Sequence, residues 1–279
     1  MSEFARSLKS IAKLVLLSRP LRMPRATGDS IVILANGPSL NDTIAQSADV
    51  LKSMPTLAVN FAAAADVFFE LRPAYYVMAD PVFFAEPKAD NLVRQRRSLA
   101  RVDWPMTLFV PREYSDRIPA EIASNPSISV VSFNNVGVEG WHWLENFAYS
   151  RSLGMPRPRN VLIPAIMVAV GMGFRNIYLT GADHSWMKTI CVDEDNHVIS
   201  VQPHFYKDAA DEQRRVDTTY RGLHLHDVVH SFYVAFSSYH RLQRYARARG
   251  INIYNSTPGS FIDAFERRPL PANNNTSTK

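Results

Sequence analysis

The chain has 279 residues, of which 46% are hydrophobic, so it is long enough to bury one large α/β core together with a small lid. Its single cysteine, Cys191, excludes an internal disulfide and a cysteine-based zinc cluster and is typical of a reducing compartment, so we expect a cytoplasmic protein. The net charge of +5 suits an anionic ligand or surface, and no nucleic-acid-binding motif accompanies it.

Residues 1–25 form a basic, amphipathic segment that we expect to be helical. Phe4, Leu8, Ile11 and Val15 recur at helical spacing. Such a helix either lies on an anionic membrane, which would make the protein peripheral to the inner membrane, or packs on the body of the protein. Lys13 interrupts the apolar residues, which argues against a signal peptide or a membrane span. The basic residues, set against one acid at Glu3, are Arg6, Lys9, Lys13, Arg19, Arg22 and Arg25.

The first three expected strands each end on a polar side chain. The apolar run that begins at residue 31 stops at Asn36, within the sequence NGPS of residues 36–39, and the next two strands end at Asn60 and Asp80. The carboxyl ends of parallel strands form the ligand crevice of an open α/β sheet, where a phosphate can approach the backbone N–H groups of the next helix. The pattern predicts a nucleotide site, although Asn and Asp are also common where strands simply turn.

Further along the chain, residues 106–111 and 128–133 are expected to form two more strands, with a charged helix near residues 91–101 outside them. Residues 160–173 carry small and apolar side chains and predict a buried helix that ends at Gly171 and Gly173. A central strand follows at residues 177–180 and leads into the sequence GADHSW of residues 181–186. This strand end is where we first expect chemistry.

The last third of the chain combines an expected lid with a long helix. Residues 187–222 carry no strong core signal, which is typical of a lid, and residues 189–192 and 197–201 flank the sequence DEDN of residues 193–196 like a hairpin. A helix capped by Asp227 is expected to run to residue 249, followed by a strand at residues 251–254. We expect one domain over residues 26–268 and a disordered tail over residues 269–279. The helix side chains expected to face inward are Val229, Phe232, Tyr233 and Phe236.

Four landmarks resemble, in their order, the bacterial sialyltransferases of glycosyltransferase family 42: NGPSL at Asn36, Asn60 after a strand, the unit GMGFRNIYLTGADHSW, and the closing INIYNSTPGSFIDAF. The opening and the GxD strand end are also similar to a Rossmann-like group related to 6-hydroxymethylpterin diphosphokinase, many of whose members belong to surface-glycan gene clusters. The resemblance covers about residues 30–265. It implies a single Rossmann-like parallel-sheet α/β domain with a small lid, and metal-independent, inverting transfer of sialic acid from CMP-sialic acid without a cofactor.

The resemblance also implies where the donor lies. It places Asn36, Gly37 and Ser39 near the donor phosphate and Asn60 near the cytidine or the phosphate. Asn160, at the start of the buried helix, matches a donor-contacting Thr of the sialyltransferases.

Asp183 matches the family's Asp, and its neighbour His184 is a second catalytic candidate because it lies at the same strand end. Ser185 falls on a Tyr that helps the phosphate leave in the family, so that role is expected to pass to Tyr206 or Lys207 of the lid. Asp80 is expected to contact substrate.

The family's general base is a His just before the long helix that precedes the last strand. This region contains His224, His226 and His230. We favour His226, because the neighbouring Asp227 would raise its basicity and a His titrates near the pH at which it can take a proton from an acceptor hydroxyl.

The sequence therefore predicts a glycosyltransferase that moves a nonulosonic acid or a similar sugar from a CMP-linked donor to a surface glycan or glycolipid, as in lipopolysaccharide or capsule synthesis. Two alternatives stay open: a pterin-type diphosphokinase or other phosphoryl-transfer enzyme, which would need Mg²⁺, and a non-catalytic nucleotide-sugar-binding protein. A metal-dependent hydrolase is disfavoured, because no tight ligand spacing such as HExxH is present. Its ligands would come from Asp183, His184, His204, His224 and His226.

Overall fold

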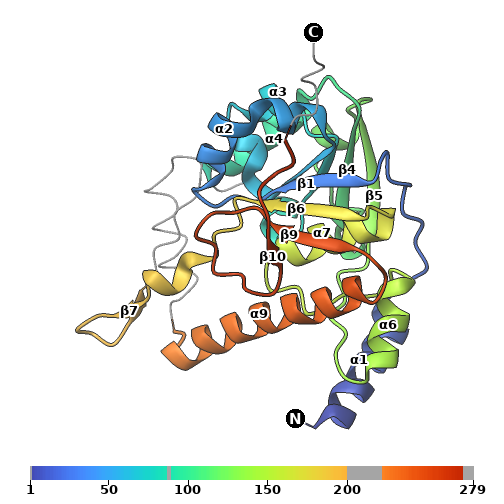
Figure 1. Cartoon of the computed structure of the whole chain (residues 1–279), viewed down its shortest axis with the longest axis vertical. Helices are drawn as coiled ribbons and strands as arrows, with labels where there is room; N and C mark the ends of the chain where they lie inside the picture. Colours follow the sequence, from blue (N-terminus) through green and yellow to red (C-terminus); the bar gives the residue numbers. More distant parts are fainter. Residues whose placement is uncertain (1, 87–88, 200–221, 273–279) are drawn as a thin grey trace.

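The computed structural model describes residues 2–86, 89–199 and 222–272. Its centre is an eight-stranded sheet in which all neighbouring strands are parallel (Figure 1). The central strands are rich in Ile, Leu and Val because they are buried on both faces. The strands are β1 (Ser30–Leu34), β2 (Thr56–Val59), β3 (Tyr75–Val77), β4 (Met106–Pro111), β5 (Ile128–Phe133), β6 (Asn176–Thr180), β9 (Asn252–Asn255) and β10 (Glu266–Arg267).

The strand order across the sheet is β10-β9-β6-β1-β2-β3-β4-β5. From β1 the chain steps outward through β2, β3, β4 and β5, and then returns to place β6 on the other side of β1. The direction of winding therefore reverses at β1. In an open parallel sheet such a reversal leaves a crevice at the carboxyl ends of the strands, where the connections to the two sides diverge.

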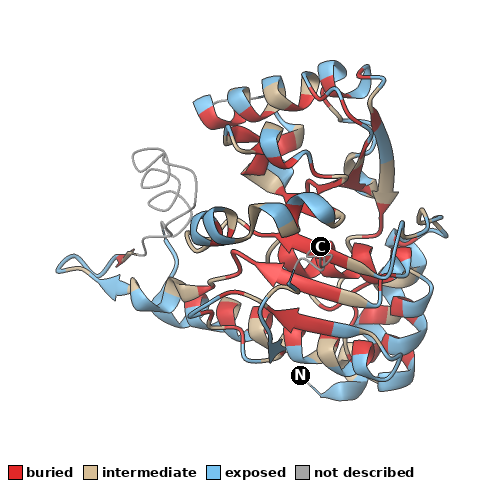
Figure 2. Cartoon of the chain, turned by 45° about the horizontal axis from the view of Figure 1, so that its top comes forward, coloured by how far each residue is buried: buried red, intermediate tan, exposed pale blue. Residues whose placement is uncertain are grey.

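Helices cover both faces of the sheet and create two cores, which appear as buried layers in Figure 2. One face packs against α6, α7 and α9, with α1 at its margin, and the other packs against α2, α3, α4 and α5. The α-helices are α1 (Glu3–Leu17), α2 (Leu40–Ser53), α3 (Phe68–Leu71), α4 (Asp90–Ala100), α5 (Ala120–Ala123), α6 (His142–Ser150), α7 (Leu162–Met172) and α9 (Leu225–Arg247). Short 3-10 turns are η1 (Asn60–Ala64), η2 (Pro81–Phe84), η3 (Arg112–Tyr114) and η4 (Ser185–Lys188).

The structure confirms the predicted parallel α/β sheet. Strands β4 and β5 have the predicted bounds, β6 is central as predicted, and α7 ends at Gly173, whose φ of 103° is left-handed. The sequence analysis missed α6 and β10. Helix α6 has no single apolar side, because Leu144 and Ala148 are buried while Trp143 and Phe147 are exposed. Strand β10 is two exposed charged residues long, so no apolar pattern marks it.

The predicted inward face of α9 is wrong in part. Phe232 is buried and Phe236 is partly buried, but Val229 and Tyr233 are exposed. The helix carries two neighbouring rows of apolar side chains, one of which begins at Val228 and the other at Val229. Helical spacing alone does not tell which row faces the sheet. The row that packs inward is Val228, Phe232, Ala235, Tyr239, Leu242 and Ala246.

The expected hairpin in the lid region is confirmed. Strands β7 (Cys191–Val192) and β8 (Val198–Ile199) pair antiparallel around the turn that contains Asp193. The rest of the predicted lid, over residues 200–221, lies outside the described residues, as does most of the predicted disordered tail. Within the described ranges, no helix combines the length and the apolar character needed to cross a bilayer.

Candidate active site

The turns that follow strands β1 and β6 contact each other. These two turns form the floor of the candidate active site. The Gly37 N–H donates to the Gly181 carbonyl at 2.8 Å. A Cβ atom on Gly37 would lie 2.5 Å from that carbonyl oxygen and 1.9 Å from Oδ2 of Asp183. Gly181 has a φ of 63°, and a Cβ there would lie 2.5 Å from the Ala35 carbonyl oxygen. Glycine is therefore required at both positions to bring the two turns together.

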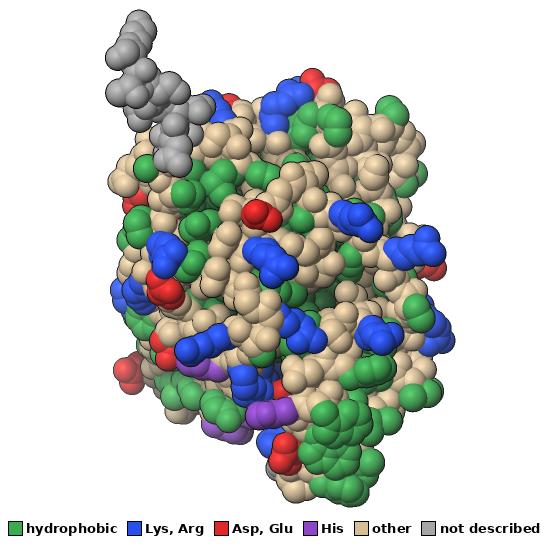
Figure 3. Space-filling view, turned by 45° about the vertical axis from the view of Figure 1, so that its right-hand side comes forward, with side chains coloured by type: hydrophobic (Ala, Val, Ile, Leu, Met, Phe, Trp, Pro, Cys, Tyr) green, Lys and Arg blue, Asp and Glu red, His purple; other side chains and the backbone are tan. Residues whose placement is uncertain are grey.

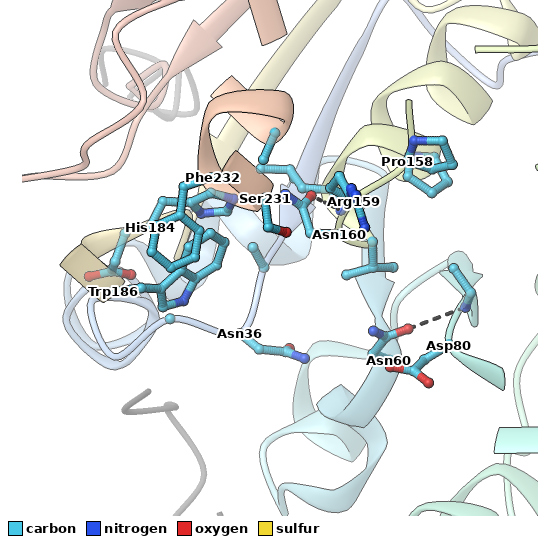
Figure 4. Close-up of a pocket in the computed structure, with 18 of the residues that line it drawn as sticks. Asn36, Asn60, Asp80, Pro158, Arg159, Asn160, His184, Trp186, Ser231 and Phe232 are labelled. Atoms are coloured by element: carbon cyan, nitrogen blue, oxygen red, sulfur yellow. Dashed lines mark hydrogen bonds between the residues drawn. The ribbon is translucent and has the colours of Figure 1, made fainter. Parts of the chain in front are cut away.

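A cleft of about 530 Å³ opens above this contact, at the reversal point of the sheet. It has an aromatic end and a polar end (Figure 4). Trp186 stacks on Phe232 at the aromatic end, with ring centroids 5.5 Å apart. Asn60 and Asp80 lie at the polar end, while Arg159 and Asn160 lie between the two. The size and the mixture of apolar and polar groups are typical of a small-ligand site.

Asp183 lies at this cleft but is also bound to the start of α2. Its Oδ2 accepts a hydrogen bond from the Ser39 hydroxyl at 2.7 Å, and its Oδ1 accepts one from the Ser39 N–H at 3.4 Å. The carboxylate therefore takes the place that we predicted for a donor phosphate at the amino end of α2. Ser39 is turned toward Asp183 and is not among the residues that line the cleft, whereas Gly37 does line it. The structure thus places Ser39 against Asp183 and outside the cleft lining, and its contact with a donor phosphate stays a prediction.

The polar residues at the strand ends hold neighbouring strands together. The Asn36 side chain donates to the Val59 carbonyl at 3.1 Å, which links the end of β1 to the end of β2. The Asn60 Oδ1 accepts from the Ala79 N–H at 3.2 Å, which links β2 to the segment after β3. Asp80 caps its own turn, since its Oδ1 accepts from the Val82 N–H at 3.1 Å. Asn36, Asn60 and Asp80 all line the cleft, so these contacts also orient them within it.

A buried hydrogen-bonded chain connects His184, Tyr239 and Asn160. The Tyr239 hydroxyl donates to Asn160 Oδ1 at 2.9 Å, and the same oxygen accepts from the Leu162 N–H at 3.1 Å. Because the hydroxyl proton is used in this way, the 2.6 Å contact between His184 Nε2 and the Tyr239 oxygen requires the ring nitrogen to donate. Both lone-pair directions of Asn160 Oδ1 are thus occupied. The Asn160 Nδ2 is buried without a hydrogen-bond partner in the described part of the chain.

His184 stays neutral over the physiological pH range. Burial lowers the pKa of His184 to about 3, and its backbone is left-handed with a φ of 50°. A neutral ring that donates through Nε2 positions Tyr239 and Asn160, rather than exchanging protons at neutral pH.

This burial predicts how stability depends on pH. The unfolded chain protonates His184 below its ordinary pKa of about 6.5, whereas the folded chain does so only near pH 3, so the folded state should lose stability as pH falls through this window. Urea unfolding between pH 7 and pH 4 measures the free energy of unfolding. His184 should lower it by up to about 1.4 kcal/mol per pH unit in the wild type as the pH falls, and His184→Gln should remove this contribution. His240→Gln, which alters an exposed His paired with Asp263, is the control. Equal pH slopes for wild type and His184→Gln would contradict the assignment.

The structure does not bring His226 into the cleft. Its side chain is 79% exposed and lies 3.4 Å from Asp227 Oδ1, whereas Asp227 itself lines the cleft. Successive residues of a helix point about 100° apart, so the two side chains leave α9 in different directions. His224 and His230 are also exposed and outside the cleft lining. Of these side chains at the start of α9, the structure therefore brings Asp227 to the cleft and none of the three histidines.

Of the other site residues expected from the sequence, some line the cleft and some do not. Ser185 lines the cleft, and its contact with substrate stays a prediction, whereas Tyr206, Lys207 and His204 lie outside the described residues. The hydrolase ligand set is not assembled by the described residues, because His226 and His224 are exposed and His184 is bound to Tyr239. Over residues 2–86, 89–199 and 222–272, the only close group of possible metal ligands is Asp193, Asp195 and His197. There Asp193 Oδ1 accepts from two backbone N–H groups of the hairpin turn.

Several polar or charged cleft residues were missed by the sequence analysis, among them Ser231 of α9. Arg159 and Asn135 line the cleft, and Asp227 was considered only as a helix cap and a neighbour of His226. Asn135 follows the carboxyl end of β5, so the same reasoning that identified Asn36 and Asn60 would have found it. Arg159 precedes α7 in a loop, where no periodic pattern marks it.

The chain matches no protein-family model and no curated protein. Among solved structures, it is similar to that of the MAf glycosyltransferase from Magnetospirillum magneticum AMB-1, with a TM-score of 0.51 and 12% sequence identity. The similarity covers 95% of this chain and 38% of that chain, so the chain spans well under half the length of that protein. At this level of identity the similarity establishes the fold.

Proposed function

We propose that this protein is a glycosyltransferase that binds the nucleotide of an activated sugar in the cleft between β1 and β6. The observation that carries the proposal is the position of the cleft, at the reversal point of a parallel sheet and between an aromatic and a polar end. The similarity in fold to the MAf glycosyltransferase supports this assignment, and so does the resemblance of the strand-end motifs to the family 42 sialyltransferases.

The donor phosphate is assigned to the amino end of α7. Arg159 supplies a positive charge there, and Asn160 Nδ2 supplies a donor whose direction is set by the two hydrogen bonds to Oδ1. The partial positive charge of the helix amino terminus favours an anion at the same place. At α2 the corresponding place is taken by the Asp183 carboxylate. Trp186 supplies an aromatic surface for the base or the sugar.

The transfer reaction is proposed to invert the sugar carbon by direct attack, without a metal. The acceptor hydroxyl loses its proton to Asp227, the carboxylate at the start of α9 that lines the cleft. Arg159 and Asn160 stabilise the charge that develops on the departing phosphate. The resemblance supports a CMP-linked nonulosonic acid or a similar acidic sugar as the donor, and a surface glycan or glycolipid as the acceptor.

Nucleotide-dependent thermal stabilisation tests the proposal. CMP, CDP, UDP, GDP and ATP are compared, each with Mg²⁺ and with EDTA, because a ligand at 100 times its Kd adds about 2.7 kcal/mol to the stability of the folded state. Stabilisation by CMP that is indifferent to EDTA is the expected result. Stabilisation by ATP that requires Mg²⁺ would instead favour the phosphoryl-transfer enzyme. Nucleotide binding without transfer to any glycan acceptor would favour the non-catalytic protein.

Arg159→Ala should weaken nucleotide binding while leaving the thermal transition of the free protein unchanged. Loss of a hydrogen bond to a charged group costs about 1.5–3 kcal/mol, which corresponds to about 10–150-fold in the dissociation constant measured by calorimetry. Arg175→Ala is a matched control, because Arg175 is also exposed but precedes β6 at the amino end of the sheet. Equal affinities for Arg159→Ala and Arg175→Ala would remove Arg159 from the phosphate site.

A further inference from the structure

Helix α1 is attached to the body of the protein by buried serines together with a minority of its apolar residues. Ser7 and Ser10 are buried. The Ser10 hydroxyl donates to the Glu139 carbonyl at 2.7 Å, and the Ser7 hydroxyl accepts from the Trp141 N–H at 2.9 Å. At the end of the helix, Ser18 donates to the Leu153 carbonyl. These contacts fix the rotation of the helix about its axis.

This rotation leaves an apolar stripe of α1 facing outward. Phe4, Leu8, Val15 and Leu16 have exposed fractions between 50% and 71%, and only Ile11 and Leu14 reach the core margin. An amphipathic helix of a globular protein normally turns its apolar side to the core, so this orientation is the reverse of the usual one. Figure 3 shows the hydrophobic side chains gathered at the lower end of the molecule, where Figure 1 places α1 and α6.

Helix α6 extends the same surface. Trp143, which is 62% exposed, and Phe147 lie one turn apart on its outer side. Trp141 connects the two helices, because its ring contacts Phe4 and stacks on Trp143, with centroid distances of 5.8 Å in both pairs. We call the surface formed by Phe4, Leu8, Val15, Leu16, Trp143 and Phe147 the α1–α6 face. A contiguous exposed apolar surface of this kind marks an interaction site.

Positive charges border the α1–α6 face. Lys9 and Lys13 lie two turns and one turn before Leu16 on the same side of α1. The Arg151 guanidinium lies over the Phe147 ring, 5.8 Å from its centroid. Side chains of Lys and Arg are also scattered over the surface above this end of the molecule, where they outnumber the acidic ones (Figure 3). The edge of the face therefore complements an anionic partner.

We propose that the α1–α6 face binds the surface of an anionic lipid bilayer. An apolar helix face with Lys at its edge and Trp beside it matches the hydrocarbon boundary and the headgroup layer of such a surface. A second copy of the chain is a poorer occupant, because a two-fold contact would bring the basic edges of both copies together. The α1–α6 face lies outside the cleft, so its binding to a bilayer is independent of the proposed function.

Vesicle co-sedimentation of the full chain tests this proposal. The protein should sediment with phosphatidylcholine vesicles that contain phosphatidylglycerol, and much less with phosphatidylcholine alone. Leu8→Glu should abolish this binding, whereas Val130→Glu, at an exposed apolar residue of β5 outside the α1–α6 face, should leave it unchanged. Lys9→Gln and Lys13→Gln should each lower the partition coefficient about fivefold, which corresponds to about 1 kcal/mol per basic residue.

Tryptophan fluorescence and the oligomeric state complete the test. Brominated lipids should quench the wild-type emission, and Trp143→Phe should reduce that quenching while the thermal transition is retained. Failure of the wild-type protein to bind anionic vesicles would overturn the proposal. So would a wild-type dimer, measured by light scattering, that Leu8→Glu converts to a monomer without any vesicle binding in either protein. Nucleotide stabilisation is measured on the same variants, so loss of the cleft assignment is distinguishable from loss of this surface.

Discussion

Asp227→Asn is expected to lower the turnover number for sugar transfer by about 10²–10⁴-fold and to leave nucleotide affinity unchanged, because a general base acts on the acceptor hydroxyl and not on the donor. The substitution is nearly isosteric. Asn keeps an oxygen that can accept the His224 N–H, which Asp227 Oδ2 accepts at 3.1 Å, so the start of α9 should be preserved. Initial rates with a CMP-linked donor, together with calorimetric nucleotide titration, measure the two quantities separately.

Three histidine variants show whether the carboxylate or an imidazole is the base. His224→Ala, His226→Ala and His230→Ala should each retain turnover within about tenfold of wild type, since none of these side chains lines the cleft. If His226→Ala carries the large loss and Asp227→Asn does not, the sequence-based choice of His226 is right. If none of the four variants loses activity, the base does not come from the start of α9.

Gly37→Ala is expected to give the largest loss of stability. The added Cβ would lie 1.9 Å from Asp183 Oδ2 and 2.5 Å from the Gly181 carbonyl oxygen, and the latter is backbone that cannot rotate away. Forcing such a contact costs about 1–3 kcal/mol or more. At about 2–4 °C per kcal/mol for a chain of this size, the melting temperature should fall by several degrees. Nucleotide-dependent stabilisation should fall as well, because the two turns form the floor of the cleft.

Gly28→Ala is the matched control, because a Cβ there meets nothing within 4 Å, and its melting temperature should stay close to that of wild type. The double variant Gly37→Ala/Asp183→Ala separates the two contacts. Removing the carboxylate removes the shorter contact but not the one with Gly181, so the double variant should be more stable than the sum of the single losses implies. A Gly37→Ala protein as stable as Gly28→Ala would show that the turns can separate without cost.

The sequence was sufficient to predict most of the sheet. Apolar runs bounded by turn residues located β1 to β6 and β9, because strands buried on both faces need continuous apolar side chains. The polar residues that end these runs located one side of the cleft, since parallel strands bring their carboxyl ends to one edge. The same local rules failed for β10, which is short and charged, and for α6, whose apolar residues are divided between the core and the surface.

Only the tertiary structure decided what the polar residues do. Whether Ser39 faces a phosphate or the Asp183 carboxylate depends on two turns that are 144 residues apart in the chain. The assignment of Asp227 rather than His226 to the cleft depends on the rotation of α9, and the outward orientation of the apolar stripe of α1 depends on serine contacts with residues 139–153. Periodicity in the sequence shows that a helix has a distinct apolar face. Whether that face points to the core or to solvent is set by long-range packing and hydrogen bonds, which no local pattern contains.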